Sequence, residues 1–311
     1  MKRYYVLMTV FVLAVCVLFS GINPALAIEK KFDYRQRQKI NKAIANLENM
    51  KGNESRESKK DLIKWGGDAV EPLIAVIKDW KGQPAELRVV CVDILGEIED
   101  RRAVPVIIDV LTEKKMTMRY NAARALGRIG DNRATPALIK LLNDKEWEVR
   151  FYTVEALGKI GDNRAAKPLA NIMLSDSHTK VRLEAIKALD KVDGRSQSKA
   201  VVRALSDSDP EVRGYAAELC ASWDIADALP AVTKMLRQDR ANITRASCAH
   251  ALGIYNNFAA IPALIQALGD DYKDVRIYAR ESLKEMTGQN FGYDKEAWSH
   301  WFELNKDKPR P

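Results

Sequence analysis

An arginine recurs at a nearly fixed period through most of this chain of 311 residues. The spacing is 31 or 32 residues, and seven positions after each arginine stands a leucine or, once, a cysteine. A period of this length predicts a solenoid of stacked repeats rather than a globule with one central cavity. The arginines are Arg88, Arg119, Arg150, Arg182, Arg213, Arg245 and Arg276. The residues seven positions later are Leu95, Leu126, Leu157, Leu189, Cys220, Leu252 and Leu283.

Residues 134–162 show how one repeat is built. Pro136 lies in the first turn of a first helix, where its missing N–H costs nothing, and a turn at Asp144 ends that helix. Apolar residues at spacings of three and four predict a second helix over residues 148–160. Gly161 suits the left-handed position after a helix. Short loops make the two helices antiparallel, so we predict an all-α, right-handed α-solenoid of about seven helix pairs.

The first 27 residues have the three parts of a secretory signal. Lys2 and Arg3 give a basic start, residues 6–19 are apolar, and small residues end at Ala27. We predict cleavage after Ala27, export to the periplasm or beyond the cell, and no spanning segment in the mature chain. The alternative is an uncleaved membrane anchor, although the apolar run is shorter than the roughly 20 residues that a span needs.

Positive charge is concentrated near the start of the mature chain. The net charge of the whole chain is +8 and the pI is about 9.2. Much of this excess lies between Glu29 and Trp65, where there are 11 basic and 6 acidic residues. The repeats are almost neutral, which together with export argues against nucleic acid as a partner. The basic segment Lys30–Lys64 is either a solvated helix face or a weak contact with an anionic envelope polymer or lipid.

Three cysteines follow the signal segment: Cys91, Cys220 and Cys248. They occupy positions at which other repeats carry alanine or leucine, so we interpret them as small buried residues. A Cys220–Cys248 bridge between neighbouring repeats is the alternative in an oxidising compartment.

The segment RYNAARALGRIGDNRATPALIKLLND, residues 119–144, closely resembles the bacterial HEAT-like repeat, the version also found in phycobilisome lyases. The resemblance covers residues 68–288. It implies that the repeated arginine and an aspartate bond between neighbouring units, as a structural ladder. The arginines would be the seven named above. The aspartates would be those that follow each second helix: Asp100, Asp131, Asp162, Asp193 and Asp224.

The two ends lack the repeat motif and are expected to cap the solenoid. We expect a helical cap over residues 28–67, the repeats over 68–288, and a closing helix with a tail over 289–311. Asp294 is suited to N-cap the closing helix, which would place Trp298, Trp301 and Phe302 on one face. Shielding of the open end is the expected role of this cluster, with a ligand platform as the alternative.

The sequence holds little that suggests catalysis. Its three histidines, His178, His250 and His300, lie far apart, and no recurring His-Glu pairs, Cys-x-x-Cys, phosphate loop or nucleophile elbow is present. The bilin-attaching lyases act inside cells, so their activity does not suit an exported chain. We therefore expect no cofactor and no metal, and a lyase-like or hydroxylase-like enzyme is the least favoured reading. His178, in a polar turn, is expected to be a simple surface residue.

Helix geometry indicates which side chains are displayed. Positions two, five and nine after each repeat arginine point away from the core, and in HEAT arrays the second helices line the concave side. Three tyrosines and charges of both signs on this strip suit recognition of a protein or peptide, although each ring could instead pack on its neighbours. We predict a non-catalytic scaffold. The candidate partner-binding residues are Tyr152, Tyr215, Tyr278, Arg124, Glu155, Lys187 and Glu218.

Overall fold

The computed structural model describes residues 24–48 and 52–307. These residues form seventeen α-helices and six short 3-10 helices, with no strand among them. The chain divides into two compact units, residues 1–106 and 107–311, whose boundary falls inside α6 (Val104–Val110). Most of the expected signal segment lies outside the described residues. Within them, no helix combines the length and apolar character needed to cross a membrane.

The first unit is a group of helices that precede the regular array. Helix α2 packs on α3 and α4 through side chains such as Ile40 and Leu47, both fully buried. Lys59 of α3 binds Asp93 and Glu97 of α5 at 2.7 and 2.9 Å. The elements are α2 (Pro24–Leu47), α3 (Asn53–Trp65), α4 (Gly67–Lys78), α5 (Ala85–Ile98) and the 3-10 helix η1 (Arg101–Ala103).

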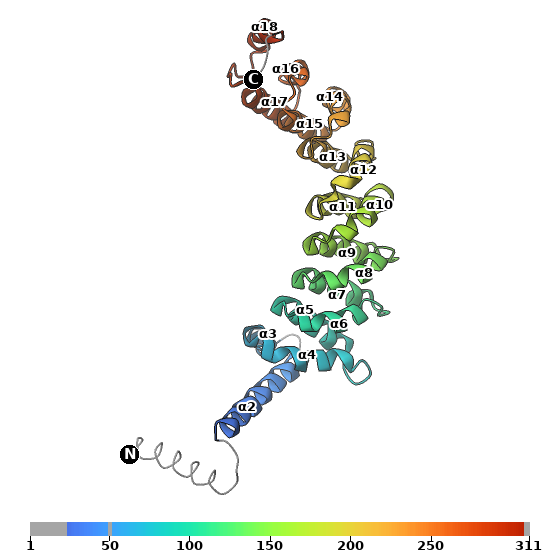
Figure 1. Ribbon diagram of the computed structural model, residues 1–311, viewed down its shortest axis with the longest axis vertical. Helices are drawn as coiled ribbons and strands as arrows, with labels where there is room; N and C mark the ends of the chain where they lie inside the picture. The colour runs from blue at the N-terminus through green and yellow to red at the C-terminus, as the bar shows by residue number, and fades with distance from the viewer. Residues whose placement is uncertain (1–23, 49–51, 308–311) are drawn as a thin grey trace, which may run out of the picture. The chain divides into compact units, whose positions relative to one another are not determined.

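The second unit is a stack of helix pairs, and the second helices of successive pairs lie side by side (Figure 1). Five first helices in this unit are α8 (Thr135–Leu141), α10 (Ala166–Ser175), α12 (Ser198–Ala204), α14 (Leu229–Gln238) and α16 (Ile261–Ala267). The second helices are α7 (Met116–Ile129), α9 (Trp147–Ile160), α11 (Thr179–Lys191), α13 (Pro210–Ser222), α15 (Asn242–Tyr255) and α17 (Lys273–Thr287).

The repeated apolar position forms the core between these layers. The residue seven positions after each repeat arginine is fully buried in every repeat. Small residues let the second helices approach closely: a Cβ added to Gly127 of α7 would lie 2.8 Å from the Cα of Ala156 in α9. Gly161 has φ of 73° and ends α9 in the left-handed conformation, as predicted. The α-solenoid expected from the period is thus confirmed.

The last helix, α18 (Lys295–Asn305), packs on α16. Asp294 caps it, since its carboxylate accepts hydrogen bonds from the backbone N–H groups of Glu296 and Ala297 at 3.0 Å. Trp298 is fully buried and donates through Nε1 to the carbonyl of Gly292 at 3.0 Å. The ring of Phe258, which precedes α16, lies 6.0 Å from that of Trp301 and 5.1 Å from that of Phe302. The aromatic side chains therefore cover the last repeat.

The three cysteines among the described residues are free and buried. Cys220 and Cys248 form no bridge. Burial raises the pKa of the Cys220 thiol to about 12, so these side chains behave as small apolar core residues.

Candidate functional site

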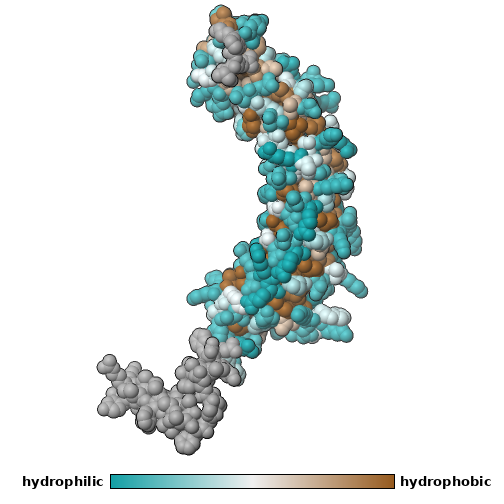
Figure 2. Space-filling model, viewed as in Figure 1, coloured by the Kyte–Doolittle hydropathy of each residue, from teal (hydrophilic) through white to brown (hydrophobic). Residues whose placement is uncertain are grey.

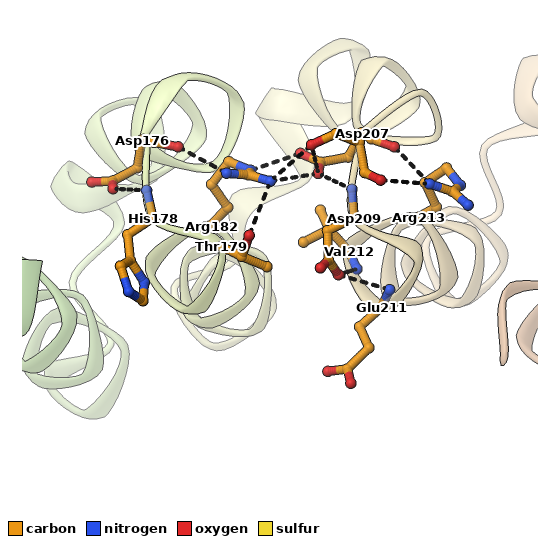
Figure 3. Close-up of polar contacts among 10 residues, drawn as sticks. Asp176, His178, Thr179, Arg182, Asp207, Asp209, Glu211, Val212 and Arg213 are labelled. Carbon is orange, nitrogen blue, oxygen red and sulfur yellow. Dashed lines mark hydrogen bonds and ion pairs between the residues drawn. The ribbon is translucent and has the colours of Figure 1, made fainter. Parts of the chain in front are cut away.

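Five of the repeat arginines bind an aspartate of the following repeat. Arg182 is an example: its Nε lies 2.9 Å from Oδ2 of Asp207 and its Nη2 lies 2.8 Å from Oδ1 (Figure 3). Both side chains are about nine-tenths buried. The five pairs are Arg119–Asp144, Arg150–Asp176, Arg182–Asp207, Arg213–Asp239 and Arg245–Asp270.

Each of these aspartates also joins the arginine of its own repeat. The backbone carbonyl of Asp207 accepts a hydrogen bond from Nη1 of Arg213 at 2.9 Å, and its carboxylate accepts another from the backbone N–H of Asp209 at 2.8 Å. The same arrangement recurs along the second unit, so the pairs connect into one ladder. At its end, Arg276 donates to the carbonyls of Asp270 and Asp271. In the first unit, Arg88 donates to the carbonyl of Ile77 at 3.0 Å.

The ladder aspartates are not those expected from the sequence, and this part of the prediction was wrong. Asp100, Asp131 and Asp162 instead N-cap the 3-10 helices that follow them. Each carboxylate accepts a hydrogen bond from the backbone N–H two residues on and binds that residue's guanidinium. Asp193 and Asp224 adopt left-handed backbone conformations. The reason is distance: the repeat arginine lies at the start of its helix and these aspartates beyond its end, about 20 Å away at 1.5 Å per residue.

The expected bond between neighbouring units nevertheless exists in a second form. Nη2 of Arg164 donates to the carbonyl of Asn132, one repeat earlier, at 2.9 Å. In the first unit, Nη2 of Arg102 donates to the carbonyl of Gly67 at 2.8 Å. The aspartates at these positions orient the arginines that make the bond.

The ladder carboxyls are stabilised in their charged form. Burial alone would raise the pKa of Asp207, but the hydrogen bonds from Arg182 and from the backbone N–H of Asp209 outweigh it, and the pKa lies below its usual range. The pKa of Asp144, Asp176 and Asp239 is lowered against the same opposing burial, and that of Asp270 is lowered chiefly by Arg245. Ionised, paired and buried, the ladder is structural rather than a site for a ligand.

The other candidate surface is formed by positions two, five and nine of α7 to α17, which we call the second-helix face. Figure 2 shows hydrophobic patches between hydrophilic ones along the repeats. Tyr215 and Tyr278 are 41% and 43% exposed. Tyr152 is half-buried, and its ring lies 5.4 Å from that of Tyr120 and 5.3 Å from that of Phe151. Tyr152 therefore packs on its neighbours, whereas the other two tyrosines are displayed.

The ring of each of these three tyrosines contacts a side chain from position five of the preceding repeat. The guanidinium of Arg124 lies 5.5 Å from the ring of Tyr152, and the ammonium of Lys187 lies 4.7 Å from the ring of Tyr215. The ring of His250 lies 5.5 Å from that of Tyr278. The three pairs recur every second repeat, since the tyrosines are 63 residues apart. This double period is present in the sequence, but it becomes visible only when repeats two apart are compared.

The glutamates of the second-helix face differ in their surroundings. Those at position five follow each tyrosine by three residues. Glu155 binds Lys159 at 2.6 Å. Glu218 lies 3.8 Å from Nδ1 of His250. Glu184, at position two of α11, is half-buried, and burial raises its pKa although Lys187 and Lys191 oppose the shift.

A hollow of about 370 Å³ opens on the second-helix face, and we call it the α13 hollow. Tyr215 and Leu219 of α13 line it, and Ile254 on the α15 side is 45% exposed. Ser222 also lines the hollow, and its side chain is small at position nine, where α9 carries Lys159. The charged and polar side chains around the hollow, besides Tyr215, are Lys187, Asp190 and Lys191 of α11, Glu218 and Ser222 of α13, and His250 of α15.

His178 is not the simple surface residue that we expected. Its ring stacks on that of Trp147, with centroids 3.9 Å apart and planes at 4°, and its backbone N–H donates to the carboxylate of Asp176. The polar turn hides this contact in the sequence, because Trp147 belongs to the preceding repeat. Among the described residues, no group of three or more histidine, cysteine, aspartate or glutamate side chains is placed to hold a metal ion.

The sequence matches the family model for HEAT repeats over residues 70–146, 122–190 and 198–284. These stretches cover more than half of the chain. No curated protein matches it significantly.

Several solved structures are similar to the chain. YibA of Escherichia coli has 21% identity and a TM-score of 0.57, and the match covers 78% of this chain and 92% of YibA. The phycocyanin lyase complex of CpcE and CpcF from Nostoc sp. has 19% identity and a TM-score of 0.44, over 76% of this chain and 94% of that one. Human deoxyhypusine hydroxylase has 21% identity and a TM-score of 0.37, over 81% and 97%. At 21% identity the likeness to YibA concerns the fold alone.

Proposed function

The chain belongs to the HEAT repeat family, and on this premise we propose that it is an exported, non-catalytic scaffold that binds a protein or peptide partner on its second-helix face. The α13 hollow supports this proposal most directly. It is open to solvent, and it combines an apolar wall with charges of both signs. Such a combination suits a protein or peptide side chain, since interface cores pair apolar anchors with a polar rim.

The exposed aromatic residues support the same surface. Tyr215 on α13 and Tyr278 on α17 present large amphipathic rings. Ile254 lies on α15, the second helix between these two. Tyrosine contributes contact area with little loss of side-chain entropy and is enriched among the residues that dominate binding energy. The arginine–aspartate ladder is internally satisfied, so it keeps the helices in register and leaves recognition to the second-helix face.

Site-specific photo-crosslinking in cells tests the binding surface. The photoreactive residue p-benzoylphenylalanine replaces Tyr215 or Tyr278, and as a control it replaces the exposed Lys234 on the first helix α14. We expect discrete crosslinked products from positions 215 and 278 and not from position 234. Equal products from all three positions, or none from 215 and 278, would contradict the proposal.

Export rests on the three-part pattern of residues 1–27. Cell fractionation should find the protein outside the cytoplasm, and N-terminal sequencing should begin at Ile28. A cytoplasmic protein that retains Met1 would refute this part. A membrane-bound protein that retains residues 1–27 would support the anchor alternative instead.

The basic segment Lys30–Lys64 remains the alternative binding region, for an anionic envelope polymer or lipid. Its charge is partly used within the first unit, since Lys59 binds Asp93 and Glu97 and Lys60 binds Glu57 at 2.8 Å. Sedimentation with vesicles that contain anionic phospholipid tests this alternative. Binding by the whole protein that disappears at high salt would favour it over the second-helix face.

A further inference from the structure

Charge is unevenly distributed along the second-helix face. The first half of the face is formed by helices α7, α9 and α11, which carry five cations and one anion at positions five and nine. The second half is formed by α13, α15 and α17, which carry three anions and no lysine or arginine at these positions. The cations are Arg124, Arg128, Lys159, Lys187 and Lys191. The anions of the second half are Glu218, Glu281 and Glu285.

Nearby side chains moderate this asymmetry without removing it. In the first half, Glu155 binds Lys159, Asp190 accepts a hydrogen bond from Nε1 of Trp223 at 3.0 Å, and Glu184 is half-buried. In the second half, Arg280 binds Glu281, and Lys284 lies next to Glu285. Positions five and nine of the first half therefore carry more cations than anions, and such a surface favours an acidic partner.

The cations occur as pairs one helical turn apart, on alternate repeats. Arg124 and Arg128 lie at positions five and nine of α7, and Lys187 and Lys191 lie at the same positions of α11. Arg124 contacts the side-chain oxygen of Asn121 at 3.3 Å and the ring of Tyr152. Lys187 contacts the ring of Tyr215. These contacts hold the two cationic groups on the face without neutralising their charge.

Helix α15, the next alternate second helix after α7 and α11, carries no such cationic pair. On α15 the corresponding residues are His250 and Ile254, and both line the α13 hollow. The positive pairs of α7 and α11 are therefore followed by an apolar wall, with Leu219 beside it. Two cationic pairs and one apolar hollow succeed one another along the face.

From this order we infer that the partner is an extended acidic polypeptide segment, with acidic residues on the α7 and α11 pairs and an apolar side chain in the α13 hollow. The inference rests on the proposed function and specifies its partner. Packed helices lie about 8–10 Å apart, so the two cationic pairs are separated by about 16–20 Å. An extended chain rises about 3.3 Å per residue, so the acidic groups should lie about five or six residues apart.

Selection from a random peptide library tests this specificity. Sixteen-residue peptides displayed on phage are panned against the purified protein at low salt. We expect enrichment of two acidic groups about five or six residues apart, with leucine, isoleucine or phenylalanine about three to six residues beyond one of them. Enrichment of basic peptides, or of no common pattern, would overturn the inference.

Variants then locate the binding site of the most enriched peptide, made synthetically. Lys187→Glu with Lys191→Glu should weaken binding about tenfold, and Ile254→Asp should weaken it as well. The control pair Lys140→Glu with Lys167→Glu makes the same charge change on the first helices α8 and α10 and should leave binding within about twofold. Circular dichroism checks that each variant is folded. Equal weakening by both lysine pairs would overturn the assignment of the site.

A polyanion control separates a peptide site from general electrostatic attraction. A twenty-nucleotide single-stranded DNA should bind more weakly than the peptide and should be insensitive to Ile254→Asp. DNA binding as tight as the peptide's, with the same sensitivity to the variants, would overturn a polypeptide partner. The photo-crosslinking result is independent: a product from position 215 without any acidic peptide selected would retain the proposed function and reject this inference alone.

Discussion

Arg182 and Asp207 are joined by two hydrogen bonds of 2.9 and 2.8 Å across the boundary between neighbouring repeats. Both side chains are about nine-tenths buried, and Arg182 also donates to the carbonyl of Asp176 at 3.0 Å. One guanidinium thus connects the turns of two successive repeats. In a solenoid, where each repeat contacts only its neighbours, such a bond acts on the interface that carries cooperativity.

Removal of this guanidinium should be strongly destabilising. Arg182→Ala leaves the carboxylate of Asp207 buried without its partner, and we expect a loss of about 3 kcal/mol in the free energy of unfolding. Urea titration followed by circular dichroism measures it. The matched control is Arg133→Ala, because Arg133 also binds an aspartate but its side chain is 56% exposed. The control should lose much less stability, because exposed ion pairs contribute little, and equal losses would contradict a structural role for the ladder.

Acid should weaken the second unit through the same carboxyls. The ladder aspartates have pKa values below those of the unfolded chain, and Arg164 lowers the pKa of Asp162 to about 2. A lowered folded-state pKa gives stability that is present above the unfolded value of about 3.9 and is lost as pH falls through the folded value. The melting temperature should therefore fall from about pH 4 towards pH 2.

The variant Asp207→Asn tests the source of this acid sensitivity. It should lower the melting temperature at pH 7, where the ionised carboxylate is missing, and it should flatten the decline between pH 4 and pH 2. An unchanged pH profile in this variant would show that other groups control the acid transition.

The period predicted the fold because the same packing contacts recur at that period. Leu157 and Gly161 have the roles that their positions indicate, and Asp294 caps the last helix as expected. The sequence did not identify which aspartate pairs with each ladder arginine. Each repeat in the middle of the array has an aspartate after the first helix and another after the second, as Asp144 and Asp162 show. Both recur at the same period, so spacing alone cannot tell which one meets the arginine.

The candidate surface was predictable only in outline. Helical geometry placed Tyr152, Tyr215 and Tyr278 on one strip, but it gave them equal standing. The structure separates them, because Tyr120 and Phe151 surround Tyr152 and Tyr215 borders a hollow. Lining residues of that hollow come from three helices, α11, α13 and α15, and the sequence of one repeat does not show how they are brought together.

The three thiols should resist modification in the folded protein. Cys91, Cys220 and Cys248 are free and buried, and burial raises the pKa of both Cys91 and Cys220 to about 12. A thiol reacts as its thiolate, so Ellman's reagent at pH 8 should react slowly with the native protein. In guanidinium chloride it should react with all three thiols of the chain cleaved after Ala27, which lacks the fourth cysteine, Cys16. Fewer than three reactive thiols after denaturation without reductant would indicate a disulfide in the purified protein.

The tyrosines of the second-helix face should divide into one that stabilises and one that binds. Tyr152→Ala removes a half-buried ring that packs on Tyr120 and Phe151, so it should lower the free energy of unfolding by about 1–2 kcal/mol. Tyr215→Ala removes a ring that is 41% exposed and should change that free energy by no more than about 0.5 kcal/mol. Binding should show the opposite order, with affinity for the selected acidic peptide reduced at least fivefold by Tyr215→Ala and little by Tyr152→Ala. Urea titration and fluorescence anisotropy of the labelled peptide measure the two quantities. If Tyr215→Ala left the affinity unchanged in a folded protein, the α13 hollow would not be where the peptide binds.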